Sequence, residues 1–456
     1  MKFFSVNPAT EEVMAEFEGM DYRQASAALK ESKGRFHEWK NTDIGEKLRL
    51  AEALGERLLG RKNELSRIVT DEMGKPIREA IAEIEKCALL CDYYSKSAKG
   101  FLEKEVIDTQ NKKSYITFEP LGLVLGIMPW NFPFWQVMRF ALPAMIAGNL
   151  VVLKHASNVP RCSLKIQEIF ADSGFPEFVF RSLLVDSSAA MRLVESDHVD
   201  AVSLTGSTSA GMQVASIAGK NIKKCVLELG GSDPFIVLED ADIGKAASNA
   251  VDARMKNAGQ SCIAAKRFIV VKGIESEFED TLVRNLEKLK VGNPLEESTD
   301  IGPLAKRDIL EDVERKVEDA RTKGAKILFG GGRPGGRGFF YQPTLLSGIK
   351  DNMEVYREEV FGPVMPMITA EDEREAVRIA NGTPYGLGAS IWSSDTEKAE
   401  RLARQIEAGN VFVNTIVKSD PKLPFGGVKK SGYGRELGEF GIREFVNIKT
   451  VVVNSQ

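Results

Sequence analysis

The chain has 456 residues, 43% of them hydrophobic and 28% charged, a balance typical of a soluble globular protein with two or more domains. Its net charge of −4 argues against nucleic-acid binding, and the lack of an apolar run of roughly 18–20 residues argues against a membrane span. The N-terminus lacks the features of a signal peptide, so we expect a cytoplasmic protein.

Helical periodicity dominates the first ~105 residues, where apolar positions recur at 3.6-residue spacing. Residues 113–119 alternate between apolar and polar side chains and predict a strand. From residue 121 onward, short β-branched runs alternate with amphipathic helices. We predict helices at 43–60, 83–104, 161–172, 189–195 and 209–218, and strands at 151–154, 178–185, 199–204 and 225–228.

A second alternating series begins near residue 234. Strands that alternate with helices indicate βαβ units and a parallel sheet. The predicted fold class is therefore α/β, with two Rossmann-like open parallel-sheet domains that meet near residues 229–233. The predicted elements of the second series are strands at 234–238, 267–271 and 411–414 and helices at 241–255, 278–289 and 309–322.

Two strands have no place in either series. Residues 445–454 form a strand-like tail, and residues 113–119 form an isolated strand. Because unpaired strand edges attract other strands, we expect a small β arm that pairs with another subunit.

Two residues, Glu228 and Cys262, indicate a catalytic function. Cys262 follows a glycine-containing turn, and Glu228 ends an apolar strand. A thiol in a setting that favours thiolate is a nucleophile, and a nearby carboxylate can activate water. The five cysteines lack CxxC spacing and the three histidines are scattered, so no metal site is predicted.

Two strand ends predict a cofactor site. Residues 205–211 join a predicted strand to a helix with glycines at Gly206 and Gly211, which suits phosphate binding but also an ordinary turn. Lys154 and Ser157 end another strand, where ligands bind in open parallel sheets; a surface lysine and a helix cap are the alternative. Glu359 and Phe361 can contact a ribose and a ring, or be solvated.

Residues 129–133 (PWNFP) form a rigid loop that can direct the Asn131 amide at an oxyanion, although Asn131 can also simply stabilise the turn. Arg139 is the one charge in an apolar helix. It must either form a salt bridge with a neighbouring carboxylate or bind a carboxylated substrate.

In combination these motifs closely resemble the aldehyde dehydrogenase superfamily, along essentially the whole chain. The resemblance implies a cofactor-binding domain at 1–107 and 121–231, a catalytic domain at 232–435, and an oligomerisation arm at 108–120 and 436–456. Family members assemble through that arm, so we expect a homodimer or homotetramer. The matching motifs are PWNFP, KxxS, GSTxxG, ELGG, GQSC, EEVFGP, and Asn414 followed by PFGG.

Carried over by position, Cys262 is the expected nucleophile, Glu228 the general base and Asn131 the oxyanion donor. The family reaction forms a thiohemiacetal, transfers hydride to a nicotinamide, and hydrolyses the resulting thioester. The residues expected to contact the cofactor are Trp130, Lys154, Ser157, Gly206, Ser207, Leu229, Glu359 and Phe361.

Position 157 distinguishes the cofactors. Members that prefer NAD often carry a glutamate where this chain has Ser157, and a serine leaves room for a 2′-phosphate beside Lys154. We therefore predict NADP, with NAD as the alternative.

The longer motifs PWNFPFWQVMRF, LKHASNVP and VKSDPKLPFGG resemble the succinate-semialdehyde dehydrogenase branch. The resemblance assigns Arg139 to the substrate carboxylate and places Trp135 and Ser419 at the substrate. Some members carry a second arginine where this chain has Lys256, which lacks the bidentate fork. The alternatives are a broader aldehyde oxidiser, acting on glyceraldehyde, lactaldehyde or glutarate semialdehyde, and a non-catalytic structural or binding protein.

Overall fold

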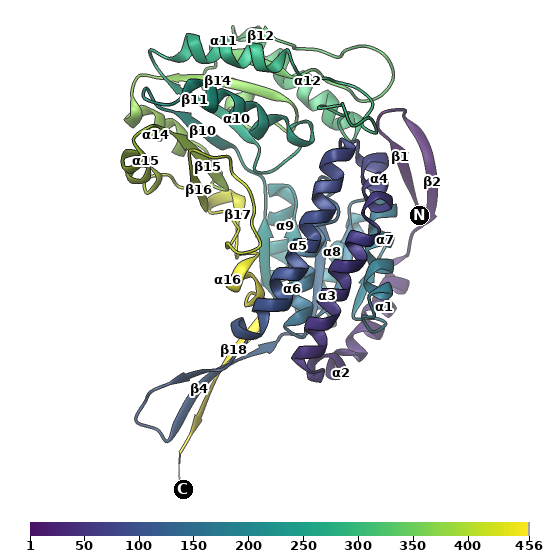
Figure 1. Ribbon diagram of the computed structural model, residues 1–456. Helices are drawn as coiled ribbons and strands as arrows, with labels where there is room; N and C mark the ends of the chain where they lie inside the picture. The colour runs from purple at the N-terminus through teal and green to yellow at the C-terminus, as the bar shows by residue number, and fades with distance from the viewer. Residues whose placement is uncertain (455–456) are drawn as a thin grey trace.

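Five strands from the first half of the chain and β17 from near its C-terminus form a six-stranded sheet with the order β17-β9-β8-β5-β6-β7. The computed structural model in Figure 1 describes residues 1–454. Neighbouring strands of this sheet are parallel except β17, which is antiparallel to β9. All residues of β6 and β8 are buried, as expected for strands with helices on both faces. The strands are β5 (Leu123–Met128), β6 (Leu150–His155), β7 (Phe180–Ser182), β8 (Ala201–Thr205), β9 (Lys224–Glu228) and β17 (Gly432–Tyr433).

Two helical layers enclose this sheet. Helices α3 to α7 contact one another in one layer, and α1, α8 and α9 contact one another in the second layer. The apolar stripes of these helices and the sheet form one continuous hydrophobic core. The helices are α1 (Tyr22–Gly34), α2 (Phe36–Asn41), α3 (Ile44–Gly60), α4 (Lys62–Met73), α5 (Ile77–Phe101), α6 (Trp135–Ile146), α7 (Pro160–Asp172), α8 (Ser187–Glu195) and α9 (Thr208–Lys220).

A second sheet, with its own hydrophobic core, has the order β12-β13-β14-β11-β10-β15-β16. Only the β12–β13 pair is antiparallel among the described strands of this sheet. Its strands are β10 (Asp233–Val237), β11 (Ala265–Val271), β12 (Lys326–Phe329), β13 (Thr344–Ser347), β14 (Val364–Ala370), β15 (Gly388–Trp392) and β16 (Asn410–Val413). Its helices are α10 (Ile243–Met255), η1 (Lys256–Gly259), α11 (Glu275–Leu286), α12 (Arg307–Thr322), α13 (Glu354–Arg357), α14 (Glu373–Asn381) and α15 (Thr396–Ala403). The predicted α/β class with two open parallel sheets is confirmed.

Three further strands form a sheet of their own, part of which projects from the first core as a long arm, visible at the lower left of Figure 1. Strand β18 (Val446–Val453) pairs antiparallel with β4 (Lys113–Pro120), and β3 (Glu105–Ile107) pairs with the opposite edge of β4. The predicted strands at 113–119 and 445–454 thus form one sheet. Pairing of this arm with another subunit stays a prediction, and Ser455 and Gln456, which we assigned to the arm, lie outside the described residues.

Three features differ from the expected element pattern. An antiparallel hairpin, β1 (Lys2–Asn7) and β2 (Glu12–Glu18), precedes the helices. Strand β7 has three residues where we predicted strand at 178–185, because Phe178 adopts a left-handed φ of 69°. After β16 the chain returns through η2 (Lys429–Ser431), β17 and α16 (Gly438–Ile442) to the first core, so residues 432–433, which we placed in the catalytic domain, pair with β9. No helix within residues 1–454 has the length and apolarity needed to cross a membrane.

Candidate active site

The strand order of the first sheet creates a crevice between β5 and β8. From β5 the chain moves outward to β6 and β7, and it then returns to place β8 on the other side of β5. Ligands of open parallel sheets bind beyond the strand carboxyl ends at such a reversal. The PWNFP loop follows β5 directly, and the 205–211 motif follows β8.

A cavity of about 210 Å³ occupies this crevice and contains most of the predicted cofactor residues. Trp130 and Phe361 meet in it edge to face, with ring centroids 5.8 Å apart. Ser207 accepts a hydrogen bond from Ala210 N and caps α9, so the free N–H groups of the first turn of α9 lie beside the cavity. The predicted residues that line it are Trp130, Asn131, Gly206, Ser207, Leu229, Cys262, Glu359 and Phe361.

Glu359 enters this cavity from the second core. Its Oε1 accepts a hydrogen bond from Gly231 N at 3.2 Å and lies 3.2 Å from Lys266 Nζ. A Cβ atom at Gly230 would lie 2.5 Å from Glu359 Oε2, so the ELGG glycine permits this close approach. A carboxylate, a capped helix start and an aromatic pair fit a dinucleotide.

Lys154 and Ser157 lie apart from the lining of this cavity. Lys154 is buried near the end of β6, and burial lowers the pKa of its ammonium. Ser157 is exposed in the loop between β6 and α7. Both therefore remain predicted cofactor contacts at the next strand end of the same crevice.

Cys262 follows a backbone turn of unusual geometry. Asn257, Ala258 and Gly259 all have positive φ, at 54°, 52° and 75°. A left-handed conformation costs a non-glycine residue roughly 1–2 kcal/mol, so other contacts must stabilise the turn. Glu79 of α5 accepts a hydrogen bond from Asn257 N at 2.7 Å, and burial raises the pKa of that carboxyl to about 7.

The turn is also joined to the PWNFP loop. Asn257 Nδ2 donates to Asn131 O at 2.9 Å, and Asn131 Nδ2 donates to Gln260 O at 3.1 Å. Gln260 Oε1 in turn accepts from Ala305 N at 2.9 Å. The predicted oxyanion donor and the predicted nucleophile are therefore held by one network, in which Asn131 retains a second amide hydrogen.

Cys262 is half-buried and lines two cavities, the one in the crevice between β5 and β8 and a second one. Burial raises the pKa of its thiol to about 11, while Arg139 and Lys266 act to lower it. Lys266 donates hydrogen bonds to the carbonyls of Ser261 and Cys262. Lys266 is not among the residues predicted from the sequence, because a lysine at the start of an apolar strand carries no local signal of this contact.

Glu228 is 2% exposed at the end of β9. The charges of the buried ion pair between Arg139 and Glu436 act on it. Burial, and secondarily the charge of Glu436, raise the pKa of the Glu228 carboxyl well above its ordinary value. A Cβ atom at Gly426 would lie 2.8 Å from Glu228 Oε1, so the PFGG glycine leaves room for this carboxylate. Glu228 acts on the Cys262 thiol, and a buried carboxyl with a raised pKa suits proton transfer there.

Arg139 forms the ion pair that the sequence left open as its alternative role. Its guanidinium contacts the Glu436 carboxylate, and both side chains are 2% exposed. Its Nη2 donates to Thr205 Oγ1 at 3.2 Å, and the guanidinium carbon lies 5.1 Å from the Phe425 ring centroid. Arg139 also lines the second cavity, where its guanidinium is already paired with Glu436.

The second cavity measures about 250 Å³ and lies between α5, α6 and residues 416–419. It brings together Cys262 and all three predicted substrate residues, Arg139, Trp135 and Ser419. Lys256, the position that departs from the branch pattern, also lines it. Cys262 thus lines both the cavity that contains most of the predicted cofactor residues and a cavity of about 250 Å³ that contains the predicted substrate residues.

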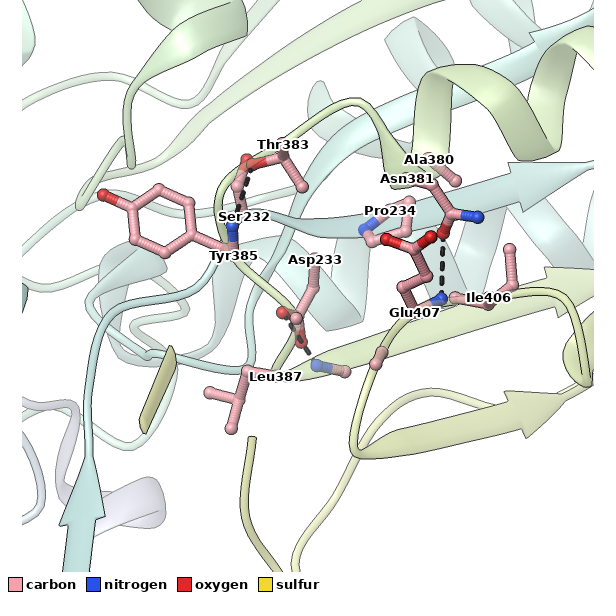
Figure 2. Close-up of a pocket in the computed structure, with 13 residues that line it drawn as sticks. Ser232, Asp233, Pro234, Ala380, Asn381, Thr383, Tyr385, Leu387, Ile406 and Glu407 are labelled. Atoms are coloured by element: carbon pink, nitrogen blue, oxygen red, sulfur yellow. Dashed lines mark hydrogen bonds between the residues drawn. The ribbon is translucent and has the colours of Figure 1, made fainter. Parts of the chain in front are cut away.

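A further hollow, drawn in Figure 2, belongs to the second core and is not part of this site. Asp233 accepts a hydrogen bond there from Gly388 N at 3.0 Å, and Asn381 accepts one from Glu407 N at 2.9 Å. Its volume of about 10 Å³ is near the lower limit for one water molecule, so it cannot hold a substrate. Among residues 1–454, no group of three or more metal-ligating side chains is present.

The model of the aldehyde dehydrogenase family matches residues 1–451. The chain belongs to the aldehyde dehydrogenase family. The family prediction is therefore confirmed, and the coverage leaves neither core outside the match.

Two full-length relatives of this aldehyde dehydrogenase carry a more specific name. The chain is 48% identical to a probable NADP+ succinate-semialdehyde dehydrogenase of Synechocystis over 99% of both chains. It is 45% identical to the NADP+ succinate-semialdehyde dehydrogenase of Mycobacterium avium, over 100% of this chain and 97% of the relative.

Solved structures agree in fold. The succinic semialdehyde dehydrogenase of Streptococcus pyogenes in complex with NADP+ superposes with a TM-score of 0.97 at 34% identity, covering 99% and 100% of the two chains. A betaine aldehyde dehydrogenase of Staphylococcus aureus in complex with NAD+ reaches 0.96 at 30% identity, covering 100% and 94%. The fold is thus shared by relatives that bind either nicotinamide cofactor.

Proposed function

We propose that this aldehyde dehydrogenase oxidises succinate semialdehyde to succinate with NADP+. The observation that carries the proposal is the position of Cys262 between two cavities, one lined by the cofactor motifs and one by the predicted substrate residues. The two full-length relatives support the predicted reaction, substrate and cofactor, since their names include all three.

The residues of the cofactor cavity would hold NADP+ through complementary contacts. Ser207 and the start of α9 suit phosphate oxygens, Glu359 suits ribose hydroxyls, and Trp130 and Phe361 suit ring systems. When bound, NADP+ supplies the acceptor for the hydride that leaves the substrate carbon. Lys154 and Ser157 are assigned to the 2′-phosphate.

Catalysis begins with the Cys262 sulfur. Because burial raises the thiol pKa to about 11, the thiol proton passes to solvent as the S–C bond forms and the C=O π electrons move onto the aldehyde oxygen. The Asn131 amide donates to the resulting oxyanion of the thiohemiacetal. After hydride loss leaves a thioester on Cys262, Glu228 takes a proton from water as the water oxygen attacks the thioester carbon. The C–S bond then breaks, succinate departs, and the Cys262 sulfur regains a proton from Glu228.

We also assign roles to whole segments. Residues 1–107 and 121–231 bind the cofactor, and residues 232–435 supply the nucleophile. Within residues 108–120 and 436–456, the arm strands β4 and β18 join subunits into a homodimer or homotetramer, an inference supported by the exposed apolar side chains of the arm strands. The cytoplasmic location expected from the sequence remains a prediction.

The experiment for the reaction is a panel of initial rates. Succinate semialdehyde, butanal and lactaldehyde are compared, each with NAD+ and NADP+. We expect the highest kcat/KM for succinate semialdehyde with NADP+. A higher kcat/KM for the neutral aldehydes would instead support the broader aldehyde oxidiser, which the neutralised charge of Arg139 favours.

A substitution of Ser157 tests the preference for NADP+ over NAD+. Ser157→Glu adds a carboxylate that repels a 2′-phosphate and accepts hydrogen bonds from a free ribose, so the NADP+ to NAD+ ratio of kcat/KM should fall at least tenfold. Ser157→Ala, which adds no charge, is the matched control and should retain the NADP+ preference. An unchanged ratio in Ser157→Glu would remove Ser157 from the cofactor site.

A further inference from the structure

The second cavity contains a lysine, Lys86 on α5, that the sequence analysis did not assign. Lys86 Nζ donates to Ser419 Oγ at 2.6 Å and lies 4.2 Å from the Trp135 ring centroid. Two of the three residues expected at the substrate thus touch one ammonium group. Lys86 and Cys262 line the same cavity, so one small molecule bound there can contact both the ammonium and the thiol.

The charge of Lys86 differs from that of the other cations around the cavity. Arg139 is neutralised by Glu436, while Lys256 and Lys418 are exposed, so water screens them. Lys86 is half-buried and forms no salt bridge within the described part of the chain. An unpaired, partly desolvated ammonium interacts strongly with an arriving anion.

The nearest carboxylate on the same helix is already occupied. Glu83 lies one turn before Lys86, but its Oε2 pairs with the buried Lys75. Its Oε1 accepts hydrogen bonds from the backbone N–H groups of Phe134 and Trp135, each at 2.9 Å. Both carboxylate oxygens of Glu83 therefore already have partners, and among the described residues Glu83 forms no salt bridge with Lys86.

We propose that the Lys86 ammonium, together with the Ser419 hydroxyl, binds the distal carboxylate of the substrate and selects carboxylated aldehydes over neutral ones. An ammonium has three donors, and Ser419 uses one of them, so two remain for carboxylate oxygens. This inference rests on the proposed function and adds Lys86 to the residues that the family resemblance places at the substrate.

The proposed contact has a pH signature. The charged and titratable groups that act on Lys86 are Arg139, Cys87, Glu83 and Asp420, and burial followed by Arg139 lowers the pKa of the Lys86 ammonium to about 8. Lys86 is charged below that pH and becomes neutral as pH rises through it. The ratio of kcat/KM for succinate semialdehyde to that for butanal should therefore fall above pH 8, and this ratio cancels the titration of Cys262.

The test uses the full-length enzyme with saturating NADP+ and three variants of Lys86. Lys86→Met and Lys86→Gln should each lower the succinate semialdehyde to butanal ratio at least tenfold, mainly through KM for the carboxylated substrate. Lys86→Arg should restore most of the ratio and remove its decline above pH 8. Lys96→Met, which removes an exposed lysine of the same helix paired with Asp92, is the matched control and should keep the wild-type ratio.

Several outcomes separate the two hypotheses. A wild-type enzyme without preference for succinate semialdehyde would refute the proposed function itself. A wild-type preference that survives in Lys86→Met, or that is lost in Lys256→Met instead, would overturn only the assignment of Lys86. Circular dichroism and the kcat for butanal show that each variant is folded.

Discussion

The buried ion pair between Lys75 and Glu83 should stabilise both the first core and the catalytic loop. Lys75 is fully buried and the Glu83 side chain is 1% exposed. The Lys75 ammonium lies 3.7 Å from the Phe132 ring centroid, and Glu83 accepts the first N–H groups of α6. The pair therefore positions the PWNFP loop that carries Asn131.

Lys75→Met leaves the Glu83 carboxylate buried without its partner, which should lower the free energy of unfolding by about 3–5 kcal/mol. Glu83→Gln should cost a similar amount, because it leaves the ammonium unpaired and weakens two charge-assisted hydrogen bonds of about 1.5–3 kcal/mol each. The double variant leaves no unpaired charge and should be more stable than either single variant.

Urea titrations followed by tryptophan fluorescence measure these effects, since Trp39, Trp130 and Trp135 report on the first core and Trp392 on the second. The transition of the first core should shift, and that of the second core should not. If the two single costs simply add in the double variant, the pair is not coupled and the reasoning fails. The kcat/KM of the Lys75→Met protein should also fall, because Asn131 moves with its loop.

Three further predictions follow from the site and the fold. Glu228→Gln should retain a burst of reduced cofactor equal to the enzyme concentration, while turnover falls by about 100-fold or more, because the thioester still forms but water is not activated. Stopped-flow absorbance measures both the burst and the turnover. Loss of the burst would give Glu228 a role before hydrolysis. Burial lowers the pKa of His155 from 6.5 to about 4, so between these pH values the unfolded state binds a proton that the folded state does not, and stability should be lost as pH falls through this interval. His155→Gln should reduce this loss of melting temperature in thermal melts. An equal dependence of the melting temperature on pH in both proteins would argue against this role of His155. Ile448 on β18 is 59% exposed, so Ile448→Glu should convert the oligomer to a smaller species in light scattering, whereas a monomeric wild-type protein would contradict the arm proposal.

Local sequence patterns predicted most of the helices and strands. The periodicities that distinguish helix from strand span a few residues, so the helix over 43–60 appears as α3 (Ile44–Gly60) and the strand over 151–154 as β6 (Leu150–His155). The hairpin β1–β2 escaped prediction because half-exposed strands have little apolar alternation to detect. Phe178 escaped because a single left-handed residue leaves no periodic trace.

The sequence by itself determined the family and predicted the reaction and the roles of Cys262, Glu228 and Asn131, because each stands in a short motif whose residue types are tied to the chemistry. Only the tertiary structure decided which charges are free. Arg139 is neutralised by Glu436 from the end of the chain, and Lys86 meets Ser419, 333 residues later in sequence. Such pairings form only when α5, α6 and the C-terminal segments pack around one cavity, so no local pattern encodes them.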